Sequence, residues 1–250
     1  MRIGVVILAL MVMSGCASSY IPPGEKADLN KFAPQDIQDA FAVKATNPFP
    51  AAIAAVRVQA PNYSNRYLEQ NGGRHGSGQY SVILTKELNE EAVLAEVGPL
   101  PQVKGVVSIN RLLLPDTLDS DEDIRVAAAR LQADLVFLYT LDTAFYDNDL
   151  STPLKVVTLG LSPTNKITAV TTCSALLLDT RTGYLYSAYE ATEKATTLST
   201  SWGSADTADE VRRETEQKAF KKLVESVAAS WPQLLQRHAP QQANAATAVQ

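Results

Sequence analysis

The chain has 250 residues, with 22 basic and 27 acidic side chains, two histidines, two cysteines and a formal net charge of −5. A mildly acidic protein without a basic cluster is a poor candidate for nucleic-acid binding, because Lys and Arg contacts to phosphate dominate that affinity. The length supports one ordinary domain with a substantial core, or at most two small ones.

The N-terminal segment starts with Met1-Arg2 and continues with an apolar run over residues 3–13. This run is too short to span a hydrocarbon core of about 30 Å, which takes roughly 20 helical residues. A basic start, a short apolar run and small residues before a cleavage point are typical of a secretory signal. Residues 1–15 are therefore predicted to be a signal peptide.

The tetrad Met13-Ser14-Gly15-Cys16 resembles the lipobox of bacterial lipoproteins, with Met13 in place of the usual leucine. The resemblance implies diacylglycerol on the Cys16 sulfur and, in most Gram-negative bacteria, a further acyl chain such as palmitate on its amine. Each buried methylene contributes about 0.8 kcal/mol, so two or three chains anchor a protein durably. Ala17 is not the aspartate of the enterobacterial retention rule, which implies the periplasmic face of the outer membrane in a Gram-negative host. The alternative is an ordinary cleaved signal with a chance cysteine.

The two ends of the remaining chain differ in composition from its middle. Residues 16–33 are polar and include two prolines and a glycine, and they are predicted to form a flexible tether. Residues 239–250 carry no charge and little bulk, and they are predicted to be a disordered tail. Residues 34–238 are then expected to form a single α/β domain.

Strand and helix patterns alternate along this domain. A nearly unbroken apolar run at residues 134–141 follows a helix, which is typical of a central strand covered on both faces. A connection at residues 179–183, ending in glycine, joins two long strands as a hairpin. Strands are predicted at residues 52–59, 80–84, 103–114, 134–141, 167–178 and 184–195, and helices at residues 85–97, from Asp121 and from Thr207.

Helix ends and faces support these predictions. Ser120 and Asp123 are spaced as a capping box, as are Thr207 and Glu210. Pro232 is expected to kink or break the last helix. Together these patterns predict an α/β (α+β) fold with one mixed sheet of about five to six strands, helices packed on it and a long C-terminal amphipathic helix. The apolar stripe of that last helix is Phe220, Leu223, Val224, Val227 and Trp231.

The block from Ala127 to Tyr139 carries a family resemblance. It reads as a helix that ends in Ala133-Asp134 and feeds a buried strand, with a long hairpin and an amphipathic helix further on. This order resembles periplasmic α/β domains such as the curli-secretion lipoprotein CsgG, the amino-terminal domain of TolB and the lipoprotein activators of penicillin-binding proteins. It is also similar to rhombotarget lipoproteins, although their glycine-containing C-terminal tail is absent here. These families are largely binding and assembly proteins, and no catalytic residue is carried over.

Two loops have the spacing of ligand-binding motifs without their residues. Gly73 and Gly78 are spaced as in a phosphate-binding loop, but a strand follows them instead of Lys-Ser and a helix. We expect a mobile connection there. The carboxylates at 119, 121 and 123 have calcium-loop spacing, but Ile124 replaces the required glycine and Arg130 the required glutamate. They are better explained by a helix N-terminus.

The usual catalytic and metal-binding residues are sparse. His75 and His238 have no second histidine at ligand spacing. Alternation around Cys173 predicts a small buried hydrophobe rather than a reactive thiol, and a lipidated Cys16 leaves it no disulfide partner. We therefore expect no metal, no cofactor and no enzymatic activity.

One apolar stretch follows the polar break at residues 147–149. If it is an exposed insertion, it forms a contact surface for a protein or a membrane, and if it is a strand or buried turn it has no such role. The tyrosines at 184, 186 and 189 leave a similar choice between sheet packing and a binding edge. The candidate partner-binding residues are Leu154, Val156, Val157, Leu159 and Leu161.

These observations favour a membrane-anchored, periplasm-facing lipoprotein that acts as a non-enzymatic protein-binding or assembly factor of the cell envelope. Its expected partners are the membrane, through the lipid on Cys16, and an envelope protein. One alternative is an oligomeric secretion-channel component resembling the curli-secretion lipoprotein, which needs membrane-crossing strands of roughly 9–11 residues. Another is an envelope hydrolase with an unrecognised site. The oligomeric state stays open.

Overall fold

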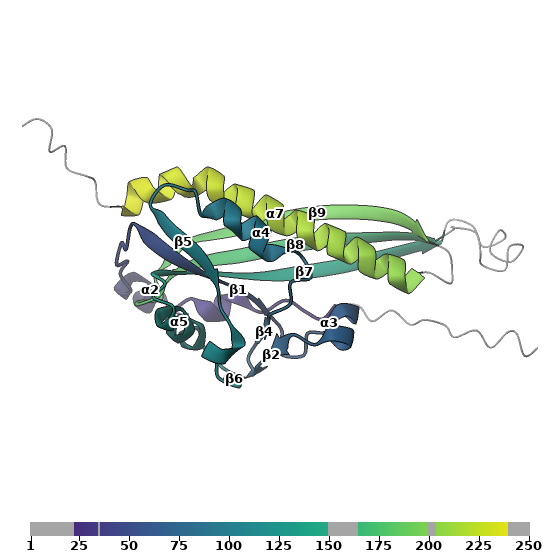
Figure 1. Cartoon of the computed structure of the whole chain (residues 1–250), viewed down its shortest axis with the longest axis horizontal. Coiled ribbons are helices and arrows are strands. Elements are labelled where there is room, and N and C mark those ends of the chain that lie inside the picture. The colour runs from purple at the N-terminus through teal and green to yellow at the C-terminus, as the bar shows by residue number, and fades with distance from the viewer. Residues whose placement is uncertain (1–22, 35, 150–164, 200–203, 240–250) are drawn as a thin grey trace, which may run out of the picture.

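The computed structural model describes residues 23–34, 36–149, 165–199 and 204–239. They form one large mixed sheet with helices on both faces, which confirms the predicted α/β class (Figure 1). The elements are η1 (Leu29–Phe32), α2 (Ile37–Ala42), β1 (Ala51–Gln59), α3 (Arg66–Asn71), β2 (Arg74–His75), β3 (Ser77–Gly78), β4 (Ser81–Ile83), α4 (Glu90–Leu94), η2 (Ala95–Val97), β5 (Val103–Ser108), η3 (Arg111–Leu113), β6 (Thr117–Leu118), α5 (Asp121–Arg130), β7 (Leu135–Asp149), β8 (Asn165–Asp179), β9 (Leu185–Ser199) and α7 (Ser204–His238).

The large sheet is centred on β1 and β7. Its strand order is β2-β4-β1-β7-β8-β9, and β5 pairs with β1. Strand β1 runs parallel to β7 and β5 and antiparallel to β4. The first residues of β7, Leu135 to Leu138, are all buried, so the predicted central strand is confirmed.

Strands β7, β8 and β9 continue well beyond the rest of the sheet. Each has 15 residues, which corresponds to roughly 50 Å at about 3.3 Å per residue. Helix α7 has 35 residues, which at 1.5 Å per residue also gives roughly 50 Å. The helix lies along one face of this three-stranded ribbon for most of its length (Figure 1).

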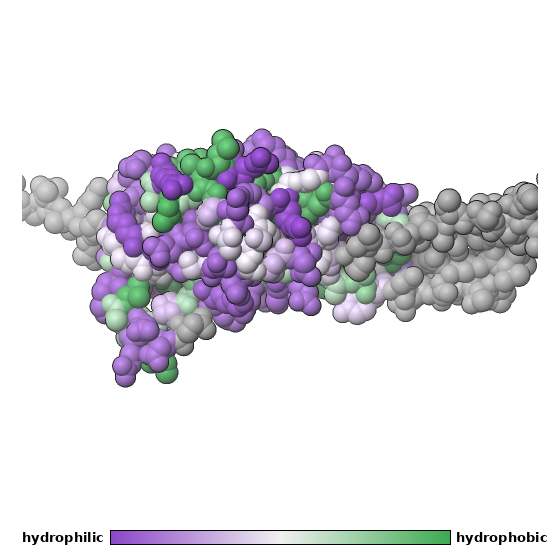
Figure 2. All heavy atoms as spheres, turned by 90° about the horizontal axis from the view of Figure 1, so that it is seen from below, coloured by the Kyte–Doolittle hydropathy of each residue, from purple (hydrophilic) through white to green (hydrophobic). Residues whose placement is uncertain are grey.

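Each face of the sheet has its own hydrophobic core. One lies under α7 and α4 and contains the whole predicted stripe of α7, including Trp231 at 0% exposure. The other lies under α5 and η1 and includes Phe32, Ile124 and Leu138. Seen from below, on the side of α5 and β6, the surface is mostly hydrophilic with a few apolar patches (Figure 2).

The folded domain starts earlier in the chain than predicted. Lys26 makes a β-bridge to Gln59, and the backbone N–H of Ala27 donates to Thr140 Oγ1 at 3.0 Å. Phe32 is 3% exposed. The stretch from residue 23 to residue 33 is therefore part of the domain, because its apolar side chains complete the core beside α5.

Several predicted element boundaries are also wrong. The helix expected at residues 85–97 starts only at Glu90, and the strand expected at 103–114 ends at Ser108. The glycine-rich connection forms β2 and β3, which pair with β4 and β6, instead of an unstructured link. By contrast, α5 starts after Ser120 as predicted, and Asp123 Oδ2 accepts the Ser120 N–H at 3.0 Å.

Helix α7 differs from two predictions, its start at Thr207 and a break at Pro232. It begins at Ser204, so Thr207 and Glu210 lie inside the helix and not at its start. It also continues through Pro232 to His238. Burial of Trp231 and Leu234 on either side of Pro232 explains this continuity, because tertiary packing outweighs the local cost of the proline.

Pro232 should therefore be a local weakness of α7. Pro232→Ala restores a backbone N–H and removes the ring clash, so we expect the free energy of unfolding to rise by about 1–3 kcal/mol. Urea denaturation measures the change, with the exposed neighbour substitution Gln233→Ala as control. An unchanged or lower stability would show that the helix gains nothing from a continuous backbone ladder here.

Candidate functional site

The predicted lipid and partner sites lie outside the part of the chain that the structure describes. These sites stay predictions. They are Cys16 and the apolar stretch with Leu154, Val156, Val157, Leu159 and Leu161. Cys173 is described and is 0% exposed, as predicted. Burial raises the pKa of its thiol, so it is not a reactive nucleophile.

Tyr184, which precedes β9, and Tyr186 and Tyr189 within β9 pack on the sheet. Tyr186 is 8% exposed, and its hydroxyl donates to Asp179 Oδ2 at 3.0 Å. Its ring centroid lies 4.9 Å from that of His238. Tyr184 and Tyr189 pack against the core under α7.

The other predicted motifs also have structural roles. His75 Nε2 lies 3.0 Å from the carbonyl oxygen of Pro115. Asp121 forms an ion pair with Arg125 at 2.6 Å within α5. Across residues 23–239, apart from the stretches left undescribed, no group of three or more potential metal ligands gathers, and no helix is long and apolar enough to cross a membrane.

A buried group of charges that the sequence did not reveal joins β1, α4 and α7. We call it the arginine–carboxylate cluster. Its side chains are nearly inaccessible, with exposures from 0% to 11%. The members are Arg57, Glu87, Glu90, Asp209, Arg212 and Glu216.

Arg212 makes most of the hydrogen bonds in this cluster. Its Nη1 donates to Glu216 Oε2 at 2.7 Å, and its Nε and Nη2 donate to Asp209 Oδ1 at 3.1 and 3.0 Å. Nη2 also pairs with Glu87. Glu87 in turn accepts from Asn65 at 3.3 Å, so α7 is tied to the segment that follows β1.

Arg57 projects from β1 into the same cluster but is less well satisfied. Its Nη2 donates to the hydroxyl oxygen of Tyr63 at 3.0 Å. Its distances to carboxylate oxygens are longer, 3.6 Å to Glu90 and 3.7 Å to Glu216. Arg57 lies between Val56 and Val58, and a charged residue inside an apolar strand was the one sequence signal that could have pointed to this site.

The cluster holds more carboxylates than guanidinium groups. Two buried guanidiniums and the half-exposed Arg213, which pairs with Asp209 at 3.3 Å, face four carboxylates, so full ionisation leaves an excess of one negative charge. Burial raises the pKa of Glu90, nearby Glu216 and Glu87 add to the effect, and Arg57 opposes it. Burial and Glu216 likewise raise the pKa of Tyr63 to about 12.

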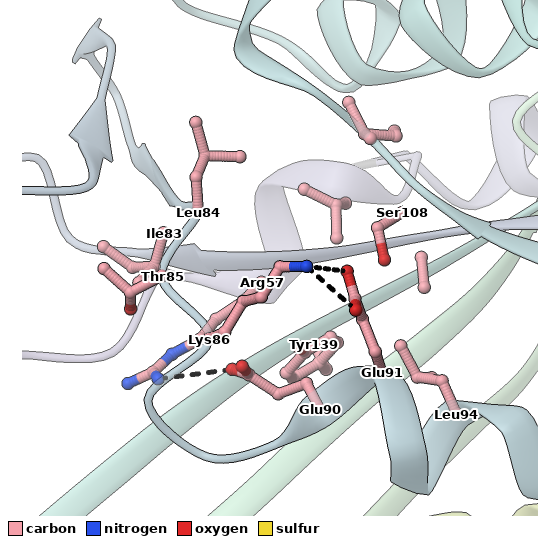
Figure 3. Close-up of a pocket in the computed structure, with 13 residues that line it drawn as sticks. Arg57, Ile83, Leu84, Thr85, Lys86, Glu90, Glu91, Leu94, Ser108 and Tyr139 are labelled. Atoms are coloured by element: carbon pink, nitrogen blue, oxygen red, sulfur yellow. Dashed lines mark hydrogen bonds and ion pairs between the residues drawn. The ribbon is translucent and has the colours of Figure 1, made fainter.

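A small pocket opens beside Arg57 and Glu90 (Figure 3). Its volume is about 80 Å³, and its walls come from β1, β5, β7, α4 and the segment before α4. Lys86 and Glu91 form an ion pair at 2.9 Å on this wall. Glu90 and Glu91 therefore belong to the same helix but have different partners, Arg57 and Lys86 (Figure 3).

Comparison with known proteins gives little further guidance. No family model matches the sequence, and no curated protein matches it. Among solved structures, the crystal structure of protein XCC0632 from Xanthomonas campestris, a DUF330 protein, matches 78% of this chain and 94% of that chain. The match has 11% sequence identity and a TM-score of 0.31, which is too low to support an argument.

The raised pKa of Glu90 gives a stability prediction with a definite sign. The folded protein binds this proton more tightly than the unfolded chain does, so its contribution is full below the unfolded pKa and is lost as pH rises through the folded pKa. Glu90→Gln keeps a neutral side chain at every pH. We expect stability at neutral pH at least equal to that of the unchanged protein, and a smaller fall in stability as pH rises above the pKa of an unfolded glutamate, about 4.3.

Arg57→Met changes the charge of the cluster in the opposite direction from Glu90→Gln. It removes a guanidinium and leaves the carboxylates of Glu90 and Glu216 without that partner, so we expect a loss of about 3–5 kcal/mol. Urea denaturation at several pH values measures both variants. Equal losses for Glu90→Gln and Arg57→Met at neutral pH would contradict the assignment of excess negative charge.

Proposed function

We propose that the protein is a lipid-anchored, non-enzymatic binding or assembly factor of the cell envelope, held at the periplasmic face of the outer membrane by the lipid on Cys16. The lipobox Met13-Ser14-Gly15-Cys16 supports the anchor and the location. The order of elements shared with periplasmic binding and assembly domains supports the class of function.

The observation that supports a binding role is that the buried charged groups of the described residues pair with other residues of the fold. Arg212 has three carboxylate partners, Asp179 accepts hydrogen bonds from Thr46, Arg181 and Tyr186, and Asp134 binds Lys104 and Arg181. These groups stabilise the fold and are not aimed at a substrate. Among the described residues, the part of the ribbon face beyond α5 and the outer edge of β5 are exposed, and such surfaces suit a protein partner.

The anchor can be tested directly. Cys16→Ser removes the acceptor sulfur, so we expect loss of labelling by radioactive palmitate and a shift of the protein from the outer-membrane fraction to the soluble fraction. Ser14→Thr keeps the cysteine and serves as control. Membrane retention of the Cys16→Ser protein would contradict the lipid anchor.

The partner can be sought by site-specific photo-crosslinking in intact cells. A photoreactive amino acid at Val107 on β5 or at Thr192 on β9 reports on the two edges of the sheet, and one at Val157 tests the predicted partner-binding stretch. We expect a discrete crosslinked band of one envelope protein from at least one position, and no such band with Cys16→Ser. Absence of a band from all three positions would argue against a stable protein partner.

Glu90 favours a hydrolase as the second candidate. A carboxyl group with a raised pKa at a pocket is a recognised sign of a general acid. Activity of the purified protein on a peptidoglycan or ester substrate, lost in Glu90→Gln, would support this candidate. An inert purified protein would leave the binding role.

A further inference from the structure

Three polar atoms beside the Arg57 pocket lack a hydrogen-bond partner in the described part of the chain. They are Nε and Nη1 of Arg57 and Oγ1 of Thr85, each with less than 1 Å² exposed. Arg57 and Thr85 both line the pocket, and the contact of Nη1 with Glu90 at 3.6 Å is longer than a hydrogen bond. Because buried polar groups are nearly always satisfied, these donors are suited to an acceptor supplied by a ligand.

The charge around the pocket selects a neutral ligand group. An anion would add to the carboxylate excess of the arginine–carboxylate cluster, and a cation would face Arg57 and Lys86. An amide has both an acceptor oxygen and donor hydrogens, which match Arg57 and the Thr85 hydroxyl. The volume of about 80 Å³ exceeds the roughly 10–15 Å³ that one water needs by the same measure, so one amide group fits.

The pocket adjoins an open strand edge. Within the described part of the chain, β5 pairs only with β1, none of its residues is buried, and Val107 is 37% exposed. A groove of about 610 Å³ runs between β5 and the α4–η2 segment, and Ser108 lines both this groove and the Arg57 pocket. Glu91 and Leu94 of α4 also line both cavities, and Figure 3 shows them close to Ser108 of β5.

The other long edge of the sheet is protected differently. On β9, Lys222 of α7 donates to the Thr192 carbonyl at 3.2 Å and pairs with Glu193 at 2.6 Å. Charged residues on or over an edge strand oppose pairing with another chain. Strand β5 carries one charged side chain, Lys104, whereas β9 carries Glu190, Glu193 and Lys194. Of the two, β5 is therefore the edge open to an added strand.

We propose that β5 accepts an extended peptide segment of the partner, with an asparagine or glutamine side chain of that segment in the pocket beside Arg57. The inference rests on the proposed binding function and names the chemistry of its partner. Backbone hydrogen bonds to β5 supply affinity, and the amide pocket supplies specificity. Lys86, whose side chain is 74% exposed, can rotate away from Glu91 as the amide enters.

Peptide binding to the detergent-solubilised lipidated protein tests the proposal. The probe is a fluorescein-labelled, end-blocked peptide Thr-Val-Gln-Val-Thr, compared by anisotropy with peptides that carry glutamate, lysine or leucine at the centre. We expect the glutamine peptide to bind about tenfold more tightly than each of the others, because lysine and leucine offer Arg57 no acceptor and glutamate adds to the negative charge of the cluster. Equal binding of all four, or tighter binding of the glutamate peptide, would overturn the proposal.

Two variants separate the pocket from the fold. Thr85→Val removes an unpaired buried hydroxyl, so it should raise Tm while it weakens the glutamine peptide about tenfold. Ser108→Trp fills the junction of groove and pocket and should abolish binding, whereas Val126→Trp on the exposed side of α5 should not. Unchanged glutamine preference in Thr85→Val would contradict the amide pocket. No peptide binding together with a persistent crosslink at Thr192 would reject this inference and leave the proposed function standing.

Discussion

The pairing of Arg57 and Arg212 with a shared set of buried carboxylates is the constraint on which the rest of the structure depends. Glu216 lies between the two guanidiniums, 2.7 Å from Arg212 and 3.7 Å from Arg57, and its other oxygen accepts from Thr143 of β7 at 3.1 Å. Helix α7 is thereby fixed against β1 and β7. Buried ion pairs of this kind add little net stability, but loss of one member is costly. The cluster therefore holds α7 in one position relative to the sheet.

That fixed position explains the shape of the molecule. With α7 anchored at its N-terminal half by Asp209, Arg212 and Glu216, its apolar stripe runs along β8 and β9 to Trp231 and Leu234 near the other end. One face of the ribbon is thus covered by a helix of the same length. The other face is buried beside α5, at Leu176 and Leu178, and is partly exposed further along β8, at Val170, Thr172 and Ser174. A fold that uses its charges for internal support and leaves strand surfaces open is suited to holding another protein.

Patterns of residues close in sequence predicted the fold class, but they could not predict contacts between residues far apart in the chain. The apolar run of β7, the stripe of α7 and the capping of α5 depend on residues close in sequence, and each is confirmed. The contact of Arg57 with Glu216 joins distant residues, so no spacing rule could reveal it. The same cluster explains the late start of α4, because Glu87 is bound to Arg212 and Asn89 has a φ of +54°. Strand β8 was predicted almost to its full length, but β7 and β9 continue past their predicted ends at residues 141 and 195, because the apolar run stops there and polar residues follow.

The native mass of the lipidated protein, extracted from membranes in a mild detergent, tests the central claim most directly. The binding role predicts a heterocomplex in which one copy of this chain carries one further envelope protein, and mass spectrometry of that protein identifies the partner. A homo-oligomer of ring size would contradict the account and favour a secretion channel. A mass equal to that of the bare chain would also contradict it, because no partner would then remain bound.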